Sequence, residues 1–217
     1  DTIVIVASEN GPQTMHGIGS DYGAQSDTGP FRGEFPSAWE GAIRTPCIMR
    51  WPGRIRAGRV SNEIVSLLDF YRTLAGVAGA TDRIPADRAM DSVDLSAFLF
   101  NDQEKSGRDH VMWFYRDELL AIKWRNFKMH FTLREPATGP AVVPGQNVTG
   151  GVRTEVNYPW LFNIDNDPKE LWNVASANPW VRGGPMARIR REYEASVAEF
   201  PNIVAGVDEP PKPARRR

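Results

Sequence analysis

The 217-residue sequence is poor in several features that would narrow its class at once. It contains a single cysteine, Cys47, which excludes an intrachain disulfide framework, a Cys-x-x-Cys redox pair and a cysteine-rich zinc site. No apolar run approaches the roughly 18 to 20 residues that span a bilayer, so no transmembrane helix is predicted. Charge of one sign is also missing, because 26 Lys and Arg balance 27 Asp and Glu, and this balance disfavours nucleic acid as a partner.

The composition that remains is that of an ordinary globular protein. With 41% hydrophobic, 24% charged and 10% aromatic residues, the chain is long enough and apolar enough to fold around a core. The sequence begins with Asp1 and enters an apolar run at once, with neither an initiator methionine nor a signal peptide. We therefore expect it to be a fragment or a processed product of a longer protein.

The N-terminal half has the pattern of an α/β domain. Residues 2–7 form an apolar run rich in β-branched side chains, typical of a strand buried on both faces of a mostly parallel sheet. Residues 8–40 lack a sustained period and predict a long loop, which in a compact domain usually carries function. Residues 47–51 predict a second parallel strand. A core-facing helix is predicted over residues 64–78, and a shorter amphipathic segment over residues 90–100.

The C-terminal half has a different pattern, and a polar run at residues 101–109 separates the two halves. We place the domain boundary there. The α/β part covers residues 1–105, a small α+β subdomain covers residues 106–207, and a proline- and arginine-rich tail at 208–217 is predicted to be disordered. Within the subdomain we predict an antiparallel sheet with strands at residues 111–115, 119–124, 128–133 and 159–164, and a charged helix at 181–200.

Two hard oxygen donors follow the first predicted strand. Glu9 and Asn10 lie in the sequence Ala-Ser-Glu-Asn-Gly-Pro at residues 7–12, at the strand end where ligands of α/β sheets are expected. Carboxylate and amide oxygens are the ligands that Ca²⁺ or Mg²⁺ prefers. The same residues also fit a plain turn, because Asn-Gly followed by proline is a strong turn signal. Spacing alone leaves both interpretations open.

Several longer strings resemble one enzyme family. Residues 2–12 (Thr-Ile-Val-Ile-Val-Ala-Ser-Glu-Asn-Gly-Pro) resemble the strand and Ser-Asp-Asn-Gly turn of the sulfatases. Further strings follow in the family's order: Gly-Pro-Phe-Arg-Gly-Glu at 29–34, Trp-Glu-Gly-Ala-Ile-Arg-Thr-Pro at 39–46, Arg-Trp-Pro-Gly at 50–53, and Leu-Phe-Asn-Ile-Asp-Asn-Asp-Pro-Lys-Glu at 161–170. The resemblance implies an alkaline-phosphatase-like α/β domain, here partial, followed by a small domain with an antiparallel sheet and a C-terminal helix.

The resemblance also implies a chemistry. In this family an Asp and an Asn of the turn bind a divalent cation, so Glu9 and Asn10 are the implied metal ligands for Ca²⁺ or Mg²⁺. The nucleophile is a formylglycine made from the first residue of a Cys/Ser-x-Pro/Ala-x-Arg motif, which this sequence lacks. Cys47 has the wrong spacing for that motif and is predicted to be a buried structural thiol. We therefore expect the nucleophile upstream of residue 1, and we expect this chain alone to be inactive.

Two positions depart from the family pattern. Glu9 stands where the family has Asp, which keeps the charge but adds a methylene group. Phe35 aligns with a Lys that contacts the sulfate in many sulfatases, so a cation is missing where negative charge develops. His16 as a general acid and Arg32 as a clamp on sulfate oxygens are the candidate replacements. The alternatives are a surface histidine and an arginine that pairs with a buried carboxylate such as Glu40.

Three other basic side chains are predicted to have no catalytic role. Lys123 is expected on a solvated strand face, and His110 and His130 are expected to be structural. The sequence therefore predicts the C-terminal part of an arylsulfatase-like hydrolase that acts on a sulfated small molecule or glycan. Two alternatives remain, a non-catalytic binding protein with the sulfatase fold and a phosphodiesterase or phosphonate hydrolase of the same superfamily.

Overall fold

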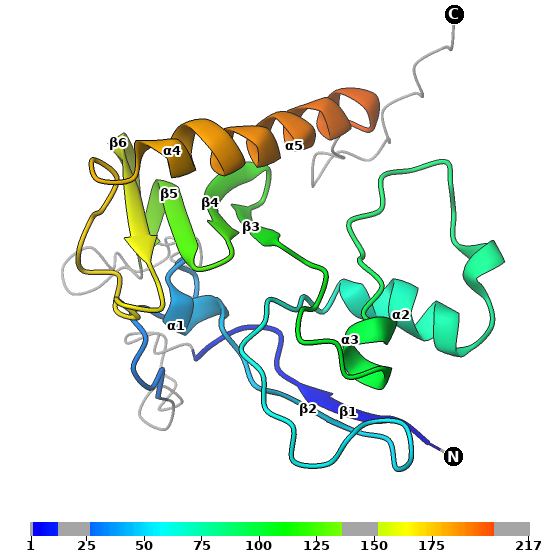
Figure 1. Ribbon diagram of the computed structural model, residues 1–217. Coiled ribbons are helices and arrows are strands. Elements are labelled where there is room, and N and C mark those ends of the chain that lie inside the picture. The colour runs from blue at the N-terminus through cyan, green and yellow to red at the C-terminus, as the bar shows by residue number, and fades with distance from the viewer. Residues whose placement is uncertain (1, 13–26, 136–151, 202–217) are drawn as a thin grey trace, which may run out of the picture.

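The computed structural model describes residues 2–12, 27–135 and 152–201. Two sheets organise these residues (Figure 1). A two-stranded sheet and several short helices make up the N-terminal region, and a four-stranded sheet carries a long C-terminal helix. Among the described residues, no helix combines the length and the apolar character needed to cross a bilayer.

The first sheet pairs strand β1 (Val4–Ala7) with strand β2 (Cys47–Arg50). The pairing is antiparallel, with Val4 opposite Arg50 and Ala7 opposite Cys47, so the expected parallel pairing of these strands is wrong. Among the described residues that lie between β1 and β2 in the sequence, the helical segment is the one-turn helix α1 (Glu40–Ile43). The apolar run is also less buried than predicted, because Val4 is 48% exposed and Val6 is 60% exposed.

Three further helical segments complete the N-terminal region, namely α2 (Asp69–Val77), the 3₁₀ turn η2 (Thr81–Arg83) and α3 (Ser96–Phe100). The predicted helix is confirmed at α2, but it begins five residues later than residue 64. The Asp69 carboxylate accepts a hydrogen bond from the backbone N–H of Ser66 at 2.8 Å, as in a capping box. This contact ends the extended segment and starts the helix.

The second sheet is a meander in the order β3-β4-β5-β6, and every neighbouring pair is antiparallel. The predicted antiparallel sheet is confirmed, although several strands are longer than the sequence indicated. Tight turns with positive φ at Arg116 and Arg125 connect the first three strands. The strands are β3 (His110–Tyr115), β4 (Glu118–Trp124), β5 (Phe127–Glu135) and β6 (Val152–Asn163).

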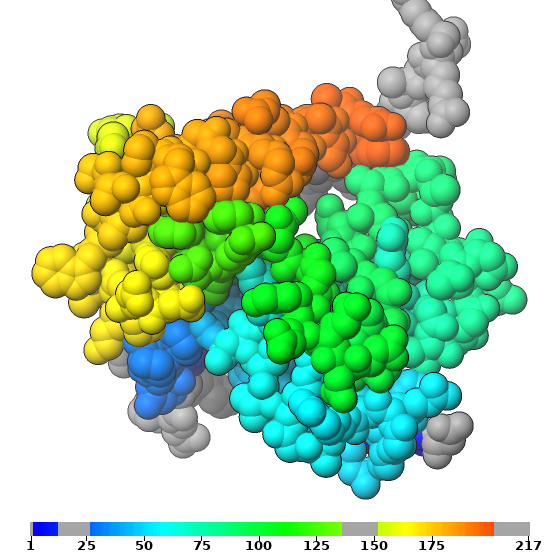
Figure 2. Space-filling view, in the orientation of Figure 1, coloured from blue at the N-terminus to red at the C-terminus, as the bar shows by residue number. Residues whose placement is uncertain are grey.

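The predicted C-terminal helix is also confirmed and lies over one face of this sheet as a ridge (Figures 1 and 2). It begins with α4 (Pro179–Val181), passes through one π-helical turn, η5 (Arg182–Met186), and continues as α5 (Ala187–Glu199). Pro179 stands at the first helical position, where its missing N–H is not needed. Pro185 lies within the π-helical turn. Such a local change of hydrogen-bond pattern tolerates the backbone N–H donor that proline lacks.

The four-stranded sheet buries a different set of residues on each face, because successive side chains of a strand point to opposite sides. Ile122, Met129 and Leu161 pack with Met186 and Ile189 beneath the helical ridge. The opposite face holds a second cluster, in which Leu133, Phe162 and Ile164 surround Trp39. Trp39 immediately precedes α1. Residues at and beside the one-turn helix α1 therefore attach the N-terminal region to the sheet.

Candidate functional site

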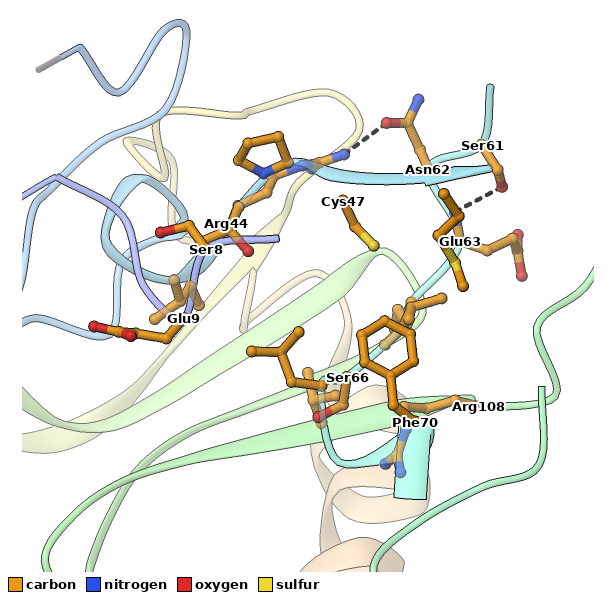
Figure 3. A pocket seen from close by; sticks show the side chains of 18 of the residues that line it. Ser8, Glu9, Arg44, Cys47, Ser61, Asn62, Glu63, Ser66, Phe70 and Arg108 are labelled. Carbon is orange, nitrogen blue, oxygen red and sulfur yellow. Dashed lines mark hydrogen bonds between the residues drawn. The ribbon is translucent and has the colours of Figure 1, made fainter. Parts of the chain in front are cut away.

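A wide cleft of about 1820 Å³ lies beside the end of β1. Residues 8–12 and 61–68 line it from the N-terminal region, and residues 110–114 of β3 line it from the C-terminal sheet. Figure 3 shows the side chain of Arg44 reaching Asn62, with Arg44 Nη2 and Asn62 Oδ1 2.9 Å apart. Both regions of the chain thus contribute walls to one open cavity.

The two implied metal ligands lie at the edge of this cleft. Glu9 is exposed, and Figure 3 shows its carboxylate pointing away from the Cys47 and Phe70 side chains. Asn10 is half-buried, and its Nδ2 donates a hydrogen bond to the carbonyl oxygen of Gly11 at 2.6 Å. The amide nitrogen of Asn10 is therefore used locally, while its oxygen is the atom with the chemistry of a cation ligand.

These donors fit part of a Ca²⁺ or Mg²⁺ site. Both are hard oxygen groups, and they lie on adjacent residues of one turn. The described ranges contain no group of three or more His, Cys, Asp or Glu side chains that could hold a metal ion. Because Ca²⁺ takes six to eight oxygen ligands, residues 2–12, 27–135 and 152–201 supply at most some of them.

The other candidate residues are distributed differently from the prediction. His16 lies outside the described residues. Arg32 was expected to pair with a buried carboxylate such as Glu40, but it pairs with Glu135 instead. Nη2 of Arg32 lies 3.3 Å from Oε1 of Glu135, and the guanidinium lies over the Trp39 ring, 3.9 Å from its centroid. Phe35 donates its backbone N–H to the carbonyl oxygen of Pro12 at 3.1 Å. Phe35 is therefore adjacent to the segment that carries Glu9 and Asn10.

Two predictions about single side chains are wrong. Cys47 is exposed, because β2 pairs with β1 and its side chain lines the open cleft. Lys123 is not on a solvated face, since its side chain is only 14% exposed and its Nζ lies 2.7 Å from Oε2 of Glu40. The alternation of β4 directs Lys123 toward α1, on the side of the sheet opposite to Ile122.

Lys123 belongs to a group of charged side chains that sequence reasoning missed, which we call the buried ion cluster. Nζ of Lys128 bridges two carboxylates, at 3.2 Å from Oε1 of Glu40 and 3.2 Å from Oε1 of Glu170. The side chains of Lys128 and Glu170 are fully buried, and that of Glu40 is 2% exposed. The cluster consists of Glu40, Lys123, Lys128, His130 and Glu170.

Glu170 is the acceptor that joins the regions. Its carboxylate accepts hydrogen bonds from the backbone N–H of Glu40 at 2.8 Å, from Nζ of Lys128 at 3.2 Å and from Nε2 of His130 at 2.7 Å. Since a carboxylate only accepts, Nε2 of His130 carries the proton. His130 Nδ1 has no hydrogen-bond partner among the described residues. His130 is thus held in the interior by Glu170, and Nδ1 of His110 lies 2.6 Å from Oδ1 of Asp109.

Burial and pairing oppose each other in setting the charges of the cluster. Burial favours the neutral form of Glu40, but the ammonium groups of Lys128 and Lys123 outweigh it and lower the pKa of Glu40 to about 2. Burial also opposes ionisation of Glu170, yet Lys128 and His130 hold its pKa below the usual range. Burial lowers the pKa of His130, although its hydrogen bond to Glu170 acts against this shift. The carboxylates are therefore ionised and the imidazole is neutral near pH 7.

A sequence signal for this cluster existed. Lys128 and His130 alternate with the apolar residues Phe127, Met129 and Phe131 in one strand, so they must share one face of the sheet. Glu40 and Glu170 lie in strings that carry the family resemblance. Charged residues on an inward face require partners of opposite charge. What the sequence could not give was which carboxylates these partners are.

Comparison with known proteins identifies the class to which this fold and this cleft belong. Residues 106–216 match the family model described as the C-terminal region of aryl-sulfatase, and residues 1–80 match the sulfatase model. The chain therefore belongs to the sulfatase family, in agreement with the resemblance of its motifs.

Individual relatives give the extent of the match. An N-acetylgalactosamine-6-sulfatase of Canis lupus familiaris is 31% identical over 188 residues, covering 82% of this chain and 34% of that protein. A steryl-sulfatase of Mus musculus is 34% identical over 184 residues, covering 78% and 28%. The crystal structure of the PsFucS1 sulfatase from Pseudoalteromonas sp. superposes with a TM-score of 0.76 at 31% identity, covering 92% of this chain and 38% of that one. The chain thus spans about a third of the length of the relatives it matches.

Proposed function

We propose that this chain is the C-terminal part of a sulfatase that hydrolyses sulfate esters. The observation that carries the proposal is the turn at the end of β1, where Glu9 and Asn10 present oxygen donors beside an open cleft. The two family models, which match in the family's order, support it. In this proposal the formylglycine nucleophile lies upstream of residue 1, and this chain alone is inactive.

Glu9 and Asn10 are the proposed ligands of a divalent cation, Ca²⁺ or Mg²⁺. When bound, such a cation would stabilise negative charge on the sulfate oxygens. Asn10 is held in place by its own bond to the Gly11 carbonyl, so its oxygen is oriented before any ligand arrives. Glu9 has no such restraint, and its longer side chain lets the carboxylate reach a cation from an exposed position.

The proposed substrate is a sulfated small molecule or glycan. The relatives named above include an N-acetylgalactosamine-6-sulfatase and a steryl-sulfatase, names that point to a sulfated sugar and a sulfated sterol for those two proteins. Arg32 is proposed as a contact for sulfate, and His16 as a general acid. Arg32 stacks on Trp39 and is about one third exposed, which leaves part of its guanidinium accessible.

The test uses the product of the complete coding region, expressed with a formylglycine-generating enzyme. We expect hydrolysis of p-nitrophenyl sulfate that is lost on addition of a chelator and falls at least tenfold in Glu9→Ala. Glu192→Ala, at an exposed position of α5 that does not line the cleft, is the control and should retain activity. Release of phosphate from a phosphodiester, without release of sulfate, would favour the phosphodiesterase alternative. Cation-dependent ligand binding without hydrolysis would favour the binding protein.

A further inference from the structure

The turn formed by residues 8–11, which we call the Glu9 turn, rests directly on α1. The backbone N–H of Gly11 donates to the carbonyl oxygen of Ala42 at 2.6 Å. A Cβ atom at position 11 would lie 2.0 Å from the carbonyl oxygen of Gly41, so only glycine permits this approach. On its other side, β1 is tied to β2 by the pairing of Ala7 with Cys47. The position of Asn10 therefore depends on where α1 lies.

Helix α1 cannot fix its own position. It has four residues, whereas isolated helices shorter than about 12 residues are marginal in water. The buried ion cluster holds it at its N-terminal end, through the Glu40 backbone N–H that donates to Glu170 at 2.8 Å. The Glu40 side chain is held separately by Lys128 at 3.2 Å and Lys123 at 2.7 Å. Both the backbone and the side chain of Glu40 are thus attached to groups of the C-terminal region.

The cluster is itself rigid. Lys128 and His130 project from adjacent inward positions of β5, which is paired on both sides by β4 and β6. The His130 ring lies 4.3 Å from the Trp39 ring, measured between centroids, and Trp39 is 2% exposed. Glu170 adopts a positive φ of 52°, a conformation that is unfavourable for this residue and is maintained by the contacts of its carboxylate.

We propose that Lys128, His130 and Glu170 are positioning residues for the candidate cation site: they fix α1, and α1 fixes the turn that carries Glu9 and Asn10. The proposal rests on the proposed function for its catalytic meaning. It gives the C-terminal region a role in a cation site whose proposed ligands, Glu9 and Asn10, both lie in the N-terminal region. Partners of metal ligands that act in this indirect way usually change metal affinity 10- to 100-fold when they are removed.

The experiment compares two isosteric variants in the product of the complete coding region. Glu170→Gln removes the charge that binds Lys128 and weakens the acceptor for Glu40. Asp69→Asn is the matched control, since Asp69 is also fully buried and its Oδ1 lies 2.5 Å from Nη2 of Arg108, but it does not contact α1. Two quantities are measured, namely amide hydrogen exchange of the peptide covering residues 8–12 and Ca²⁺ affinity by calorimetry.

We expect Glu170→Gln to accelerate exchange at residues 8–12 and to weaken Ca²⁺ binding at least about tenfold. Asp69→Asn should instead accelerate exchange near Ser66 and Val93, whose backbone N–H groups it binds, and leave Ca²⁺ affinity within twofold. Glu170→Asp, which keeps the charge, should recover part of the lost affinity. If Glu170→Gln matches Asp69→Asn in both measurements, the positioning role is wrong.

Failure of the proposed function would be recognised separately. If Glu9→Gln binds Ca²⁺ as tightly as the wild type, the cation assignment falls, and exchange at residues 8–12 alone decides the positioning role. If Glu170→Gln is recovered only in unfolded form, His130→Gln takes its place. That variant removes the ring that donates to Glu170 at 2.7 Å and stacks near Trp39, and it is judged by the same comparison with Asp69→Asn.

Discussion

The N-terminal and C-terminal regions of this chain differ sharply in how they bury their apolar residues. In the C-terminal sheet, Ile122 and Leu161 are fully buried between β-strands and the helical ridge. In the N-terminal sheet, Val6 is 60% exposed and Ile48 is 67% exposed, although both lie in strands of comparable apolar character. Hydrophobic sequence is therefore sufficient to form a strand, but a covering layer within the chain is needed to bury it.

The comparison extends to chemistry. The proposed cation ligands lie in the poorly buried region, on a turn beside an open cleft. The well-buried region holds charged side chains that contact no ligand of that turn, yet they anchor the helix on which it rests. The proposed cation site and the buried ion cluster are thus separated along the sequence and meet at α1.

The largest expected effect comes from disrupting the buried ion cluster, which connects α1 to the C-terminal region. Lys128→Met leaves the Glu40 and Glu170 carboxylates buried without the cation between them, and we expect a loss of about 3–5 kcal/mol in the free energy of unfolding at pH 7. Urea denaturation measures it. Lys105→Met is the control, because Lys105 is 82% exposed in its pair with Glu63, and it should cost at most about 1 kcal/mol. Equal losses in the two variants would contradict a stabilising role for the cluster.

The difference between the two sheets is tested by truncating one residue in each. Leu161→Ala creates a cavity in a closed core and should reduce the free energy of unfolding by about 2–5 kcal/mol. Ile48→Ala removes a side chain that is 67% exposed and should change it by only about 0.5 kcal/mol. Thermal and urea unfolding of both variants give these values. A loss at Ile48 as large as that at Leu161 would mean that β2 is covered under the conditions of the measurement.

Acid should weaken the ion pairs of the buried ion cluster. The folded-state pKa of Glu40 is about 2, below its ordinary value of 4.5, so its contribution is fully present above about pH 4.5 and is lost as the pH falls toward 2. The lowered pKa of Glu170 acts in the same direction. We expect the free energy of unfolding of the wild type to decrease by an amount on the order of 3 kcal/mol over this pH range. In Glu40→Gln, the free energy of unfolding measured by urea denaturation should depend less steeply on pH. An unchanged pH dependence would assign the acid sensitivity to other groups.

The smallest effect is expected where the turn meets α1. Gly11→Ala places a Cβ atom 2.0 Å from the Gly41 carbonyl oxygen, so the turn must move, at a cost of about 1–3 kcal/mol. Gly183→Ala is the control, since an added Cβ there meets nothing within 4 Å, and alanine favours the helical turn. Chemical denaturation should therefore give a lower free energy of unfolding for Gly11→Ala and a higher one for Gly183→Ala. A neutral Gly11→Ala would mean that the turn does not rest on α1.

Much of the fold followed from local pattern. Short segments rich in aromatic and aliphatic residues placed the four strands of the C-terminal sheet. The helical period of apolar residues placed α2, and a charged outer face placed α5. The beginning of α2 was missed because a capping contact between Asp69 and Ser66, and not the apolar period, sets where the helix starts. The direction of β2 was missed because an apolar run specifies a strand but not its partner.

Only part of the candidate site could be predicted from the sequence. Glu9 and Asn10 could be proposed as cation ligands because they carry hard oxygen donors and lie in a string that resembles the family's turn. Lys123 was placed on a solvated face because a lysine on a strand is usually exposed, whereas here Glu40, 83 residues away in sequence, draws it inward. The partner of Arg32 was wrong for a similar reason, since Glu135 and Trp39 occupy the position that Glu40 was expected to fill.

The sequence by itself determined the family, the strands and helices, and which residues are proposed as cation ligands, because these depend on side-chain chemistry and on periods of two and 3.6 residues. Only the tertiary structure decided which charges are buried together, that Cys47 is exposed and that the Glu9 turn rests on α1. Pairs such as Lys128 with Glu170 join residues that are 42 positions apart. No local pattern specifies such partners, since they are set by how the two regions pack.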